Sequence, residues 1–372
     1  MRDSSISMIL IYFIYFFLIL RFTVTLFNFI SNPKLTKTGK KYNDLVSILI
    51  PARDEELNII DLLESILDQD YQNYEVIVLD DHSSDQTFKL CSDFCEMHKR
   101  FKVLKGKALP KDWLGKNYAC SQLAEMANGN YLIFLDADET ISDGLINNSI
   151  HRMKLNKLSL LSIFTDQVTL TWGERLVVPL MHFLLLNLLP LRLVRLSGNP
   201  SFSAASGQFM MFDADNYKSN LWHEQVKGKV VEDIEIMKLI KVNGYNGETL
   251  LANGYIHCRM YRSFSEAVEG FSKNFFAGFN YSVFGLFFYL LLVVLGPIAI
   301  TYFLGIELVL FALSLIVLSR IMISLLSGQS VWRNVLLHPF QLLCMLFISV
   351  QSVKKHFTKT ILWKGRIIRK RS

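Results

Sequence analysis

Cysteine is scarce in this 372-residue sequence, and the few cysteines follow no regular spacing. They are Cys91, Cys95, Cys120, Cys258 and Cys344. An odd number of scattered cysteines argues against a disulfide framework and favours reduced thiols in the cytosol. Cys91, Cys95 and His98 could share one face of a helix, but a structural zinc site needs four ligands and no fourth lies nearby. We interpret these three residues as part of a helical core.

Repeats and low-complexity stretches are also absent, and the charge is unevenly distributed. The formal net charge is +6, and much of the excess lies in two basic clusters beside apolar segments. This pattern predicts contact with an anionic membrane surface rather than with nucleic acid. Apolar residues make up 51% of the chain and concentrate near the N-terminus and after residue 280. The sequence therefore indicates a membrane protein with one soluble domain.

The N-terminal residues 1–33 are predicted to form a membrane anchor. Residues 8–30 are almost wholly apolar, interrupted by Arg21, and are long enough to span a bilayer. They lack the shorter apolar core and the small-residue cleavage site of a signal peptide, so we expect an uncleaved anchor. Four lysines follow it, at positions 34, 37, 40 and 41. The positive-inside rule then places the next domain in the cytoplasm, at the cell (inner) membrane.

The C-terminal part contains three more apolar segments, at 281–304, 308–326 and 335–353. Each is long enough to be a candidate crossing, which predicts a multi-pass protein with membrane helices across 281–353. The basic tail, 354–372, has no acidic residue and should stay cytoplasmic. Three crossings would put it outside, so we expect 335–353, with His338-Pro339 and Gln341, to be re-entrant or interfacial. Residues 258–280 are interpreted as a helix at the membrane interface.

The middle of the chain, residues 44–257, reads as a soluble α/β domain. Apolar strand-like runs at 46–51, 75–81, 101–104 and 131–135 alternate with helical patterns at 54–69, 85–99 and 117–128. Alternating strands and helices predict a mainly parallel, helix-covered sheet. One segment within it, 174–196, is apolar but short for a span, with prolines and flanking arginines. An interfacial helix and a buried core helix both explain it.

Acidic residues follow the predicted strands. Asp136 and Asp138 come directly after a buried strand, and Asp80-Asp81 follow an earlier one. Open α/β sheets bind ligands at the carboxyl ends of their strands, and side chains at i and i+2 of an extended segment point the same way. Two neighbouring carboxylates repel unless a cation lies between them, and Mg²⁺ or Mn²⁺ is the natural partner. Asp-x-Asp alone is a weak signal, because a solvated strand end has the same pattern.

Four ordered motifs resemble family 2 inverting glycosyltransferases. They are Val46-Ser-Ile-Leu-Ile-Pro-Ala-Arg-Asp-Glu55, Val76-Ile-Val-Leu-Asp-Asp-His-Ser-Ser-Asp85, Leu132-Ile-Phe-Leu-Asp-Ala-Asp138 and Val231-Glu-Asp-Ile234. The resemblance covers roughly residues 45–280, and its specificity lies in the ordered set. Residues 109–116 look like the branch that acts on carotenoid, hopanoid and ceramide-like lipids. His338-Pro339 and the segment 363–366 are similar to carotenoid glycosyltransferases of the 4,4'-diaponeurosporenoate type.

The resemblance implies a GT-A fold, a Rossmann-like α/β domain with a mainly parallel sheet, here with transmembrane helices at both ends. It implies a nucleotide-diphosphate sugar as donor, by default UDP-glucose. The residues implied to line the nucleotide-sugar pocket are Pro51, Ala52, Arg53 and Glu55, with Asp81 on the base and Asp136 on the ribose or the metal. Asp138 is implied to bind the metal.

Asp233 is implied to be the general base, with Glu232 beside it as a substitute. Both residues also suit the first turn of a helix, where the helix dipole favours anions, so a purely structural role is an alternative. A hydroxyl acceptor must lose a proton as it attacks, which requires a positioned carboxylate. A carboxylic-acid acceptor is already ionised at neutral pH and needs no base. The sequence leaves the two acceptor classes open. Single displacement would invert the anomeric centre.

The leaving diphosphate needs its growing charge neutralised, which a divalent ion does. Lys116 could add a positive charge, or it could be a solvated loop lysine. The Q/R-x-x-R-W motif of processive and ceramide-type family members is missing, since the corresponding region, 269–275, contains no Arg-Trp. Its absence argues against a polymer-making enzyme. The resemblance and the apolar segments lead us to expect transfer to an apolar lipid such as a carotenoid or apocarotenoic acid. The alternatives are a polyisoprenyl-phosphate, hopanoid or ceramide-like acceptor, or a non-catalytic nucleotide-sugar-binding membrane protein.

Overall fold

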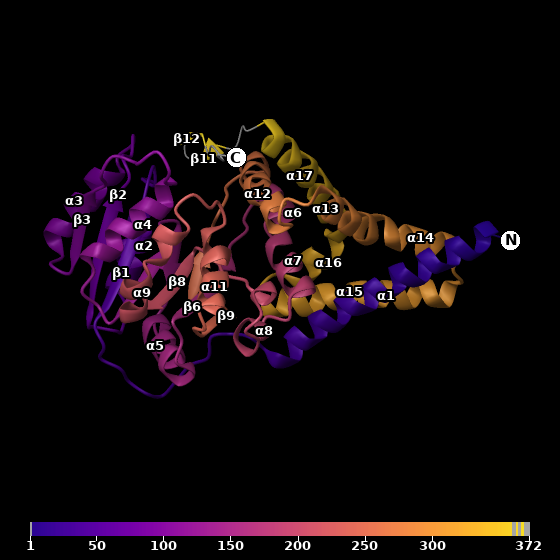
Figure 1. Cartoon of the computed structure of the whole chain (residues 1–372), viewed down its shortest axis with the longest axis horizontal. Helices are drawn as coiled ribbons and strands as arrows, with labels where there is room; N and C mark the ends of the chain where they lie inside the picture. The colour runs from indigo at the N-terminus through magenta and orange to yellow at the C-terminus, as the bar shows by residue number, and fades with distance from the viewer. Residues whose placement is uncertain (1, 359–361, 364–365, 368–372) are drawn as a thin grey trace. The chain divides into compact units, whose positions relative to one another are not determined.

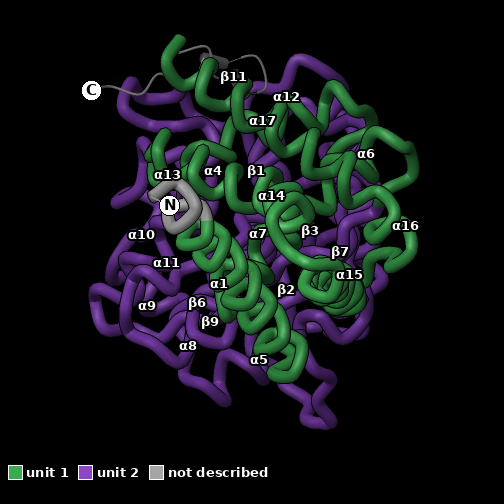
Figure 2. Tube along the Cα trace, turned by 90° about the vertical axis from the view of Figure 1, so that its right-hand side faces the viewer, with its two compact units in different colours: residues 1–32, 169–190, 261–362 green, residues 33–168, 191–260, 363–372 purple. Residues whose placement is uncertain are grey.

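A computed structural model describes residues 2–358, 362–363 and 366–367. The chain divides into two compact units, which Figure 2 shows in different colours. Unit 1 comprises Met1–Asn32, Thr169–Pro190 and Tyr261–Leu362, and unit 2 comprises Pro33–Val168, Leu191–Met260 and Trp363–Ser372. Much of the predicted basic tail, including Lys359, Lys364 and Arg369, lies outside the described residues, as does the middle of the 363–366 motif.

Unit 2 is built on a seven-stranded sheet with the order β3-β2-β1-β4-β8-β6-β9 (Figure 1). The strands are β1 (Val46–Ala52), β2 (Tyr74–Asp80), β3 (Phe101–Lys105), β4 (Tyr131–Leu135), β6 (Leu160–Phe164), β8 (Phe209–Asp213) and β9 (Gly247–Leu251). β1 pairs in parallel with β2 and β4, β2 with β3, and β6 with β9. β8 is antiparallel to both of its neighbours. The carboxyl ends of β1, β2 and β4 therefore meet at one edge of the sheet.

Helices cover this sheet, as the strand sequences require. All five residues of β4 are buried, which is the pattern of a strand covered on both faces. The helices of unit 2 are α2 (Ile59–Leu67), α3 (Thr87–Met97), α4 (Gly115–Met126), α5 (Leu145–Asn156), α8 (Leu193–Leu196), α9 (Ala214–Asn220), α10 (Trp222–Gln225) and α11 (Glu232–Val242), with the 3-10 turn η1 (Pro200–Phe202). α2 buries Ile59, Leu62, Leu63 and Ile66, the helical spacing of a core-facing stripe.

The turn before β4 requires glycine. A Cβ on Gly129 would lie 2.5 Å from the backbone nitrogen of Ser47 in β1, closer than any side chain allows. This close approach lets β4 start directly beside β1, which fixes the register that brings its carboxyl end to the edge. The predicted α/β fold with a mainly parallel sheet is confirmed.

A second sheet joins distant parts of unit 2 in the order β5-β10-β7. Its strands are β5 (Glu139–Ile141), β7 (Asp166–Gln167) and β10 (Ile256–Cys258). β10 runs antiparallel to β5, and Cys258 pairs with Glu139. This pairing brings the end of the domain back beside the residues that follow β4. Two further strands, β11 (Leu362–Trp363) and β12 (Arg366–Ile367), form a two-stranded sheet.

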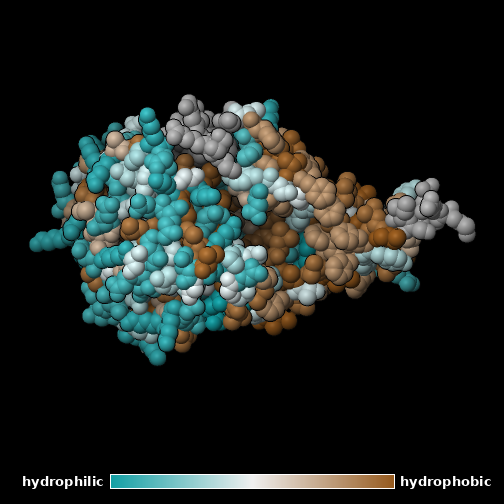
Figure 3. All heavy atoms as spheres, in the orientation of Figure 1, coloured by the Kyte–Doolittle hydropathy of each residue, from teal (hydrophilic) through white to brown (hydrophobic). Residues whose placement is uncertain are grey.

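Unit 1 is helical. Its elements are α1 (Arg2–Ser31), α6 (Trp172–Val177), α7 (Leu180–Leu188), α12 (Phe264–Gly278), α13 (Val283–Leu290), the π-helical turn η2 (Leu291–Leu295), α14 (Gly296–Phe303), α15 (Ile306–Leu326), α16 (Val331–Leu336) and α17 (His338–Thr358). Hydrophobic residues gather over these helices in Figure 3. By length and composition, three stretches of the described chain could cross a membrane: Met8–Ser31, Val283–Phe303 and Ile306–Leu326. α17 is not among them.

The apolar segment 174–196 is divided by its prolines into short helices. α6 begins with a capping box, in which Thr171 and Glu174 satisfy each other's backbone N–H groups. α7 packs on α1, where the Asn28 side chain donates to the carbonyls of Leu186 (2.9 Å) and Leu189 (2.8 Å). Residues 169–190 therefore belong to the helical unit, and α8 to unit 2. The domain boundaries expected from the sequence stay predictions.

Candidate active site

The loops after β1 and β2 are joined by hydrogen bonds. Each contains one non-glycine residue in the left-handed conformation, Asp54 (φ 52°) and His82 (φ 57°), which turns the chain sharply at the sheet edge. Arg53 Nη1 donates to the carbonyls of Asp81 (2.5 Å) and His82 (3.1 Å). The carboxylate of Asp54 accepts the N–H of Ser84 at 2.7 Å. The loop pair is thus held by side chain to backbone bonds.

The residues predicted to bind the nucleotide lie in this loop pair. Pro51 and Ala52 end β1, and the buried Ala52 carbonyl accepts the N–H of Asp81 at 2.8 Å. Glu55 follows in the same loop, and its carboxylate accepts a hydrogen bond from Asn58 at 2.8 Å. The structure therefore brings Pro51, Ala52, Glu55 and Asp81 together with Arg53, as the motif order implied.

A second group is centred on the ammonium of Lys116, at the start of α4. Its Nζ lies 2.7 Å from Oδ1 of Asp136 and 3.6 Å from Oε1 of Glu232. It also donates to the carbonyl of Gly207 at 3.3 Å. These residues come from α4, the end of β4, the loop before β8 and the first turn of α11. Lys116 is therefore an ion-paired residue at the start of a helix rather than a solvated loop lysine, and its role in binding the nucleotide sugar stays a prediction.

Gly207 fits this cluster because it has no side chain. Its N–H donates to Oδ2 of Asp233 at 2.9 Å. A Cβ at this position would lie 3.0 Å from Nζ of Lys116 and 3.2 Å from Oε1 of Glu232. Sequence reasoning missed Gly207. Its only signal was a small residue in a polar stretch just before the buried strand β8.

The ionisation of the cluster follows from burial and close charges. Burial opposes the charged form of Lys116, but the carboxylates of Asp136 and Glu232 outweigh it and hold the Lys116 pKa well above its usual value. Burial, opposed by Lys116 and reinforced by Asp233, raises the pKa of Glu232 to about 7. Burial also raises the pKa of Asp233, against the opposing effects of the Ile234 and Gly207 N–H groups and of Lys116. Carboxyls with raised pKa values suit acid–base catalysis near neutral pH.

A third group lies just beyond, at the start of β5. Asp138, Glu139 and Cys258 each place one ligand atom within 4.8 Å of the others. The Cys258 thiol donates to Oδ2 of Asp138 at 3.7 Å. The Glu139 side chain is buried, and neither of its carboxylate oxygens has a hydrogen-bond partner among the described residues. Burial, then Asp138 and Asp136, raises the pKa of Glu139 well above its usual value.

These oxygens fit a hard divalent cation. A buried carboxylate without hydrogen bonds is costly, and an ion held by carboxylate oxygens removes that cost. The soft thiol of Cys258 is a poor ligand for Mg²⁺ or Mn²⁺, so the carboxylates carry the fit. Glu139 and Cys258 were missed from the sequence. Glu139 was signalled only by its place next to Asp138, and Cys258 only becomes a neighbour through the β5–β10 pairing.

The two aspartates of the Asp-x-Asp motif have different partners. Asp136 pairs with Lys116, whereas Asp138 lies with Glu139 and Cys258. β4 ends at Leu135, and Ala137 and Asp138 form a turn rather than continuing the strand. The extended-strand geometry expected from the sequence therefore does not hold at this point. The assignment of both aspartates to one metal stays a prediction.

Comparison with known proteins finds a family profile that matches part of the chain. A sequence profile described as glycosyl transferase family 2 matches residues 47–221. The chain is 27% identical over 247 residues to a 4,4'-diaponeurosporenoate glycosyltransferase of Staphylococcus haemolyticus (strain JCSC1435), covering 63% of this chain and 61% of that protein. It is 28% identical over 120 residues to a beta-monoglucosyldiacylglycerol synthase of Trichormus variabilis (strain ATCC 29413 / PCC 7937), covering 32% of this chain and 25% of that protein.

The chain thus spans about three fifths of the length of the first relative and a quarter of the second. Among solved structures, it resembles the mannosyltransferase PcManGT from Pyrobaculum calidifontis in complex with GDP-Man and Mn²⁺. The TM-score is 0.55 at 14% identity, over 92% of this chain and 99% of that one. At this identity the likeness concerns the fold alone, and it confirms the predicted GT-A architecture.

Proposed function

We propose that this family 2 glycosyltransferase moves a hexosyl group, glucose in our assignment, from a nucleotide-diphosphate sugar to an apolar membrane lipid. The relative with the name 4,4'-diaponeurosporenoate glycosyltransferase supports a carotenoid or apocarotenoic acid as the acceptor. The observation that carries the proposal is the cluster of Lys116 with Asp136, Glu232 and Asp233 beside the carboxylates of Asp138 and Glu139. Such a set combines a base, a fixed cation and oxygen ligands at one sheet edge.

Asp233 is the general base in this proposal. Its carboxylate takes the proton of an acceptor hydroxyl as that oxygen bonds to the anomeric carbon. The bond from this carbon to the diphosphate oxygen breaks on the opposite face, and the configuration inverts. The N–H of Gly207, 2.9 Å from Asp233 Oδ2, fixes the orientation of the carboxylate. Glu232, the preceding residue in the same helix turn, is the substitute base.

The donor is held by two parts of the site. Pro51, Ala52, Arg53, Glu55 and Asp81 line the nucleoside pocket, in the loop pair that their hydrogen bonds make rigid. UDP-glucose is our proposed donor. The ribose lies towards Asp136.

The proposed cofactor is Mg²⁺ or Mn²⁺, held by Asp138 with Asp136, and Glu139 is the neighbouring carboxylate that fits it. When bound, a divalent ion neutralises charge on the departing diphosphate. Lys116 supplies a second, permanent positive charge. Asp136 and Glu232 hold its ammonium in place, so no side-chain reorganisation is needed as charge develops.

The membrane helices suit an acceptor that stays in the bilayer. We propose a multi-pass protein of the cell (inner) membrane whose sheet domain faces the cytoplasm, as the lysines after α1 indicate. Transfer to a lipid hydroxyl is a second candidate, favoured by the retained base Asp233 and by the glucosyldiacylglycerol-related relative. An apocarotenoic acid would give a sugar ester, and a hydroxylated lipid a glycoside.

The test is transfer of label from UDP-[¹⁴C]glucose by the full-length chain in detergent. Two acceptors of equal length are compared, a carotenoid acid and the corresponding alcohol. We expect a lipid-extractable labelled product with the acid. D233N should lower the alcohol reaction by about 10²–10⁴-fold and the acid reaction far less, because only the hydroxyl needs a base. D215N, at an exposed acid on α9, is the control. Binding of UDP-glucose without any labelled lipid would overturn the proposal in favour of a non-catalytic protein.

A further inference from the structure

Two arginines lie within the apolar helices of unit 1. Arg21 falls in the candidate span Met8–Ser31, and Arg320 in Ile306–Leu326. Only 8% of Arg21 and 1% of Arg320 is exposed. Buried charges in apolar segments are costly and are normally paired with an opposite charge. Across the part of the chain that the structure describes, neither guanidinium forms an ion pair with a carboxylate.

Their contacts are neutral instead. Arg21 Nε donates to Oδ1 of Asn187 at 2.8 Å, and its Cζ stands 5.4 Å from the ring centroid of Phe183. Arg320 stands 4.9 Å from the same ring and donates to Gln341. Nε and Nη1 of Arg320 are buried with no hydrogen-bond partner among the described residues. Both guanidinium groups therefore lie near the Phe183 ring, and most of their N–H groups donate no hydrogen bond within the described chain.

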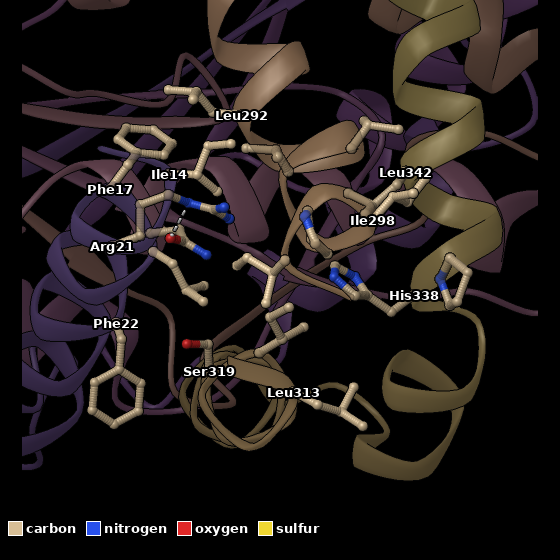
Figure 4. A pocket seen from close by; sticks show the side chains of 18 of the residues that line it. Ile14, Phe17, Arg21, Phe22, Leu292, Ile298, Leu313, Ser319, His338 and Leu342 are labelled. Carbon is tan, nitrogen blue, oxygen red and sulfur yellow. Dashed lines mark hydrogen bonds between the residues drawn. The ribbon is translucent and has the colours of Figure 1, made fainter. Parts of the chain in front are cut away.

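A cavity opens beside Arg21. It encloses about 360 Å³ and is lined by side chains from α1, α7, η2, α14, α15 and α17. Figure 4 shows Arg21 reaching in from α1, with His338 on the other side of the view and apolar side chains such as Leu292 and Leu342 around them. In the described chain, Nη1 and Nη2 of Arg21 donate no hydrogen bond. The polar lining is cationic or neutral, and Ser319 and Asn187 complete it.

We propose that this cavity binds the carboxylate end of a single-chain lipid, with Arg21 as the anchor. A guanidinium matches a carboxylate in a planar, two-pronged geometry, and the bond is stronger where water is excluded. The apolar wall receives the adjoining methylene groups. The volume lies near the lower end of ligand cavities, which suits one chain end and not a two-chain lipid. A carboxylate carries a single charge and loses less hydration energy than a phosphate dianion, so it fits a largely apolar wall better.

This inference concerns unit 1 alone and does not depend on the proposed glycosyl transfer. A chain that binds the lipid but transfers no sugar would still support it. A chain that transfers sugar with an empty cavity would leave the proposed function intact.

The test uses the full-length chain in phosphatidylcholine nanodiscs and tritiated palmitate. Wild-type protein is titrated with palmitate, with methyl palmitate and with hexadecyl phosphate as competitors. We expect palmitate to bind at one site, and the methyl ester to compete at least about tenfold more weakly, because a charge-assisted hydrogen bond is lost. Equal competition by the ester would overturn the proposal. Tighter binding of hexadecyl phosphate would overturn the carboxylate assignment.

Substitutions of Arg21 test whether this residue anchors the ligand. R21Q should weaken palmitate binding about tenfold or more, while methyl palmitate should bind the variant and the wild type alike. R333Q removes the same charge from an exposed position of α16 and should change neither affinity. Thermal unfolding confirms that R21Q is folded, and R21K, which keeps charge but not the planar fork, should be intermediate. Unchanged palmitate affinity in a folded R21Q would overturn the proposal, whereas the ester comparison needs no variant at all.

Discussion

The two units differ in whether a buried cation is paired with carboxylates. In unit 2, Lys116 contacts Asp136 directly, has Glu232 3.6 Å away, and holds a pKa well above its usual value. In unit 1, Arg21 and Arg320 are more deeply buried, and within the described chain their side chains contact aromatic rings and donate to amide oxygens, with no carboxylate partner. A cation that the chain already neutralises serves to position acids. A cation that the chain leaves without an acid is available to an anion from outside. In our proposals, the first arrangement is a preorganised catalytic cluster and the second is a binding site.

Metal removal should produce the largest difference between the units. With excess chelator, sugar transfer should fall to background, because the carboxylates of Asp138 and Glu139 would be left without their cation. Palmitate binding in unit 1 should be unchanged, since no acid of the described chain takes part in it. Both are measured on one nanodisc preparation, and Mn²⁺ or Mg²⁺ is then added back. Full transfer activity in chelator would refute metal dependence.

Removing the paired cation should have the next largest effect. K116M leaves Asp136 and Glu232 facing each other without a counter-charge, and we expect kcat to drop about 10²-fold, as for other lost charge-stabilising groups. The free energy of unfolding should fall by about 1.5–3 kcal/mol. Steady-state kinetics and chemical unfolding measure the two effects. K111M, which removes an exposed lysine in the loop just before α4, is the control. A K116M enzyme with wild-type kcat would show that the ion pairs are only structural.

Filling the space at Gly207 should have a smaller effect. G207A places a methyl group 3.0 Å from Nζ of Lys116 and 3.2 Å from Glu232 Oε1, so these groups must move by a few tenths of an ångström. We expect kcat to fall about tenfold, from the shifted cluster, and stability to fall by about 1–3 kcal/mol. G198A, where a Cβ meets nothing within 4 Å, is the matched substitution. Equal behaviour of the two variants would argue against a tight fit at Gly207.

The smallest expected effect is a gradual change of kcat/KM with pH. Burial raises the pKa of Glu232 to about 7 and also raises the pKa of Asp233, so each carboxyl loses its basic form at a higher pH than usual as pH falls. With a hydroxyl acceptor, kcat/KM should therefore decrease as pH falls below neutral, by up to tenfold per pH unit once the base is protonated. With a carboxylate acceptor the decrease should be absent until the acceptor itself is protonated. A flat profile for the hydroxyl acceptor down to pH 5 would contradict the role of these carboxyls as base.

Much of the fold was predictable because it depends on local pattern. The buried runs of β1, β2 and β4 and the stripe of α2 are visible as short apolar runs and helical spacing. Arg53, Asp81 and Asp136 directly follow these three strands, so the sheet edge could be predicted as the candidate site. The glycosyl transferase family 2 profile matches residues 47–221, in agreement with the resemblance of the ordered motifs.

The remaining contacts of the candidate site could not be predicted from the sequence pattern. The contact of Lys116 with Glu232 spans more than a hundred residues, and that of Glu139 with Cys258 a similar distance, so sequence spacing carries no trace of either. The expectation that Asp136 and Asp138 share one direction assumed a strand that in fact ends at Leu135. Likewise, Arg21 was interpreted only as an interruption of the first apolar segment, because its contact with α7 involves a segment far along the chain.

The sequence by itself determined the alternation of strands and helices, the apolar character of the candidate spans and the identity of the acids at the strand ends, since each depends on neighbours a few residues away. The tertiary structure decided which charges meet: Lys116 with its acids in one unit, and two arginines around Phe183 without any acid in the other. The physical reason is that the energy of a charge depends on what surrounds it within a few ångströms, and those surroundings are assembled from distant segments only when the chain folds.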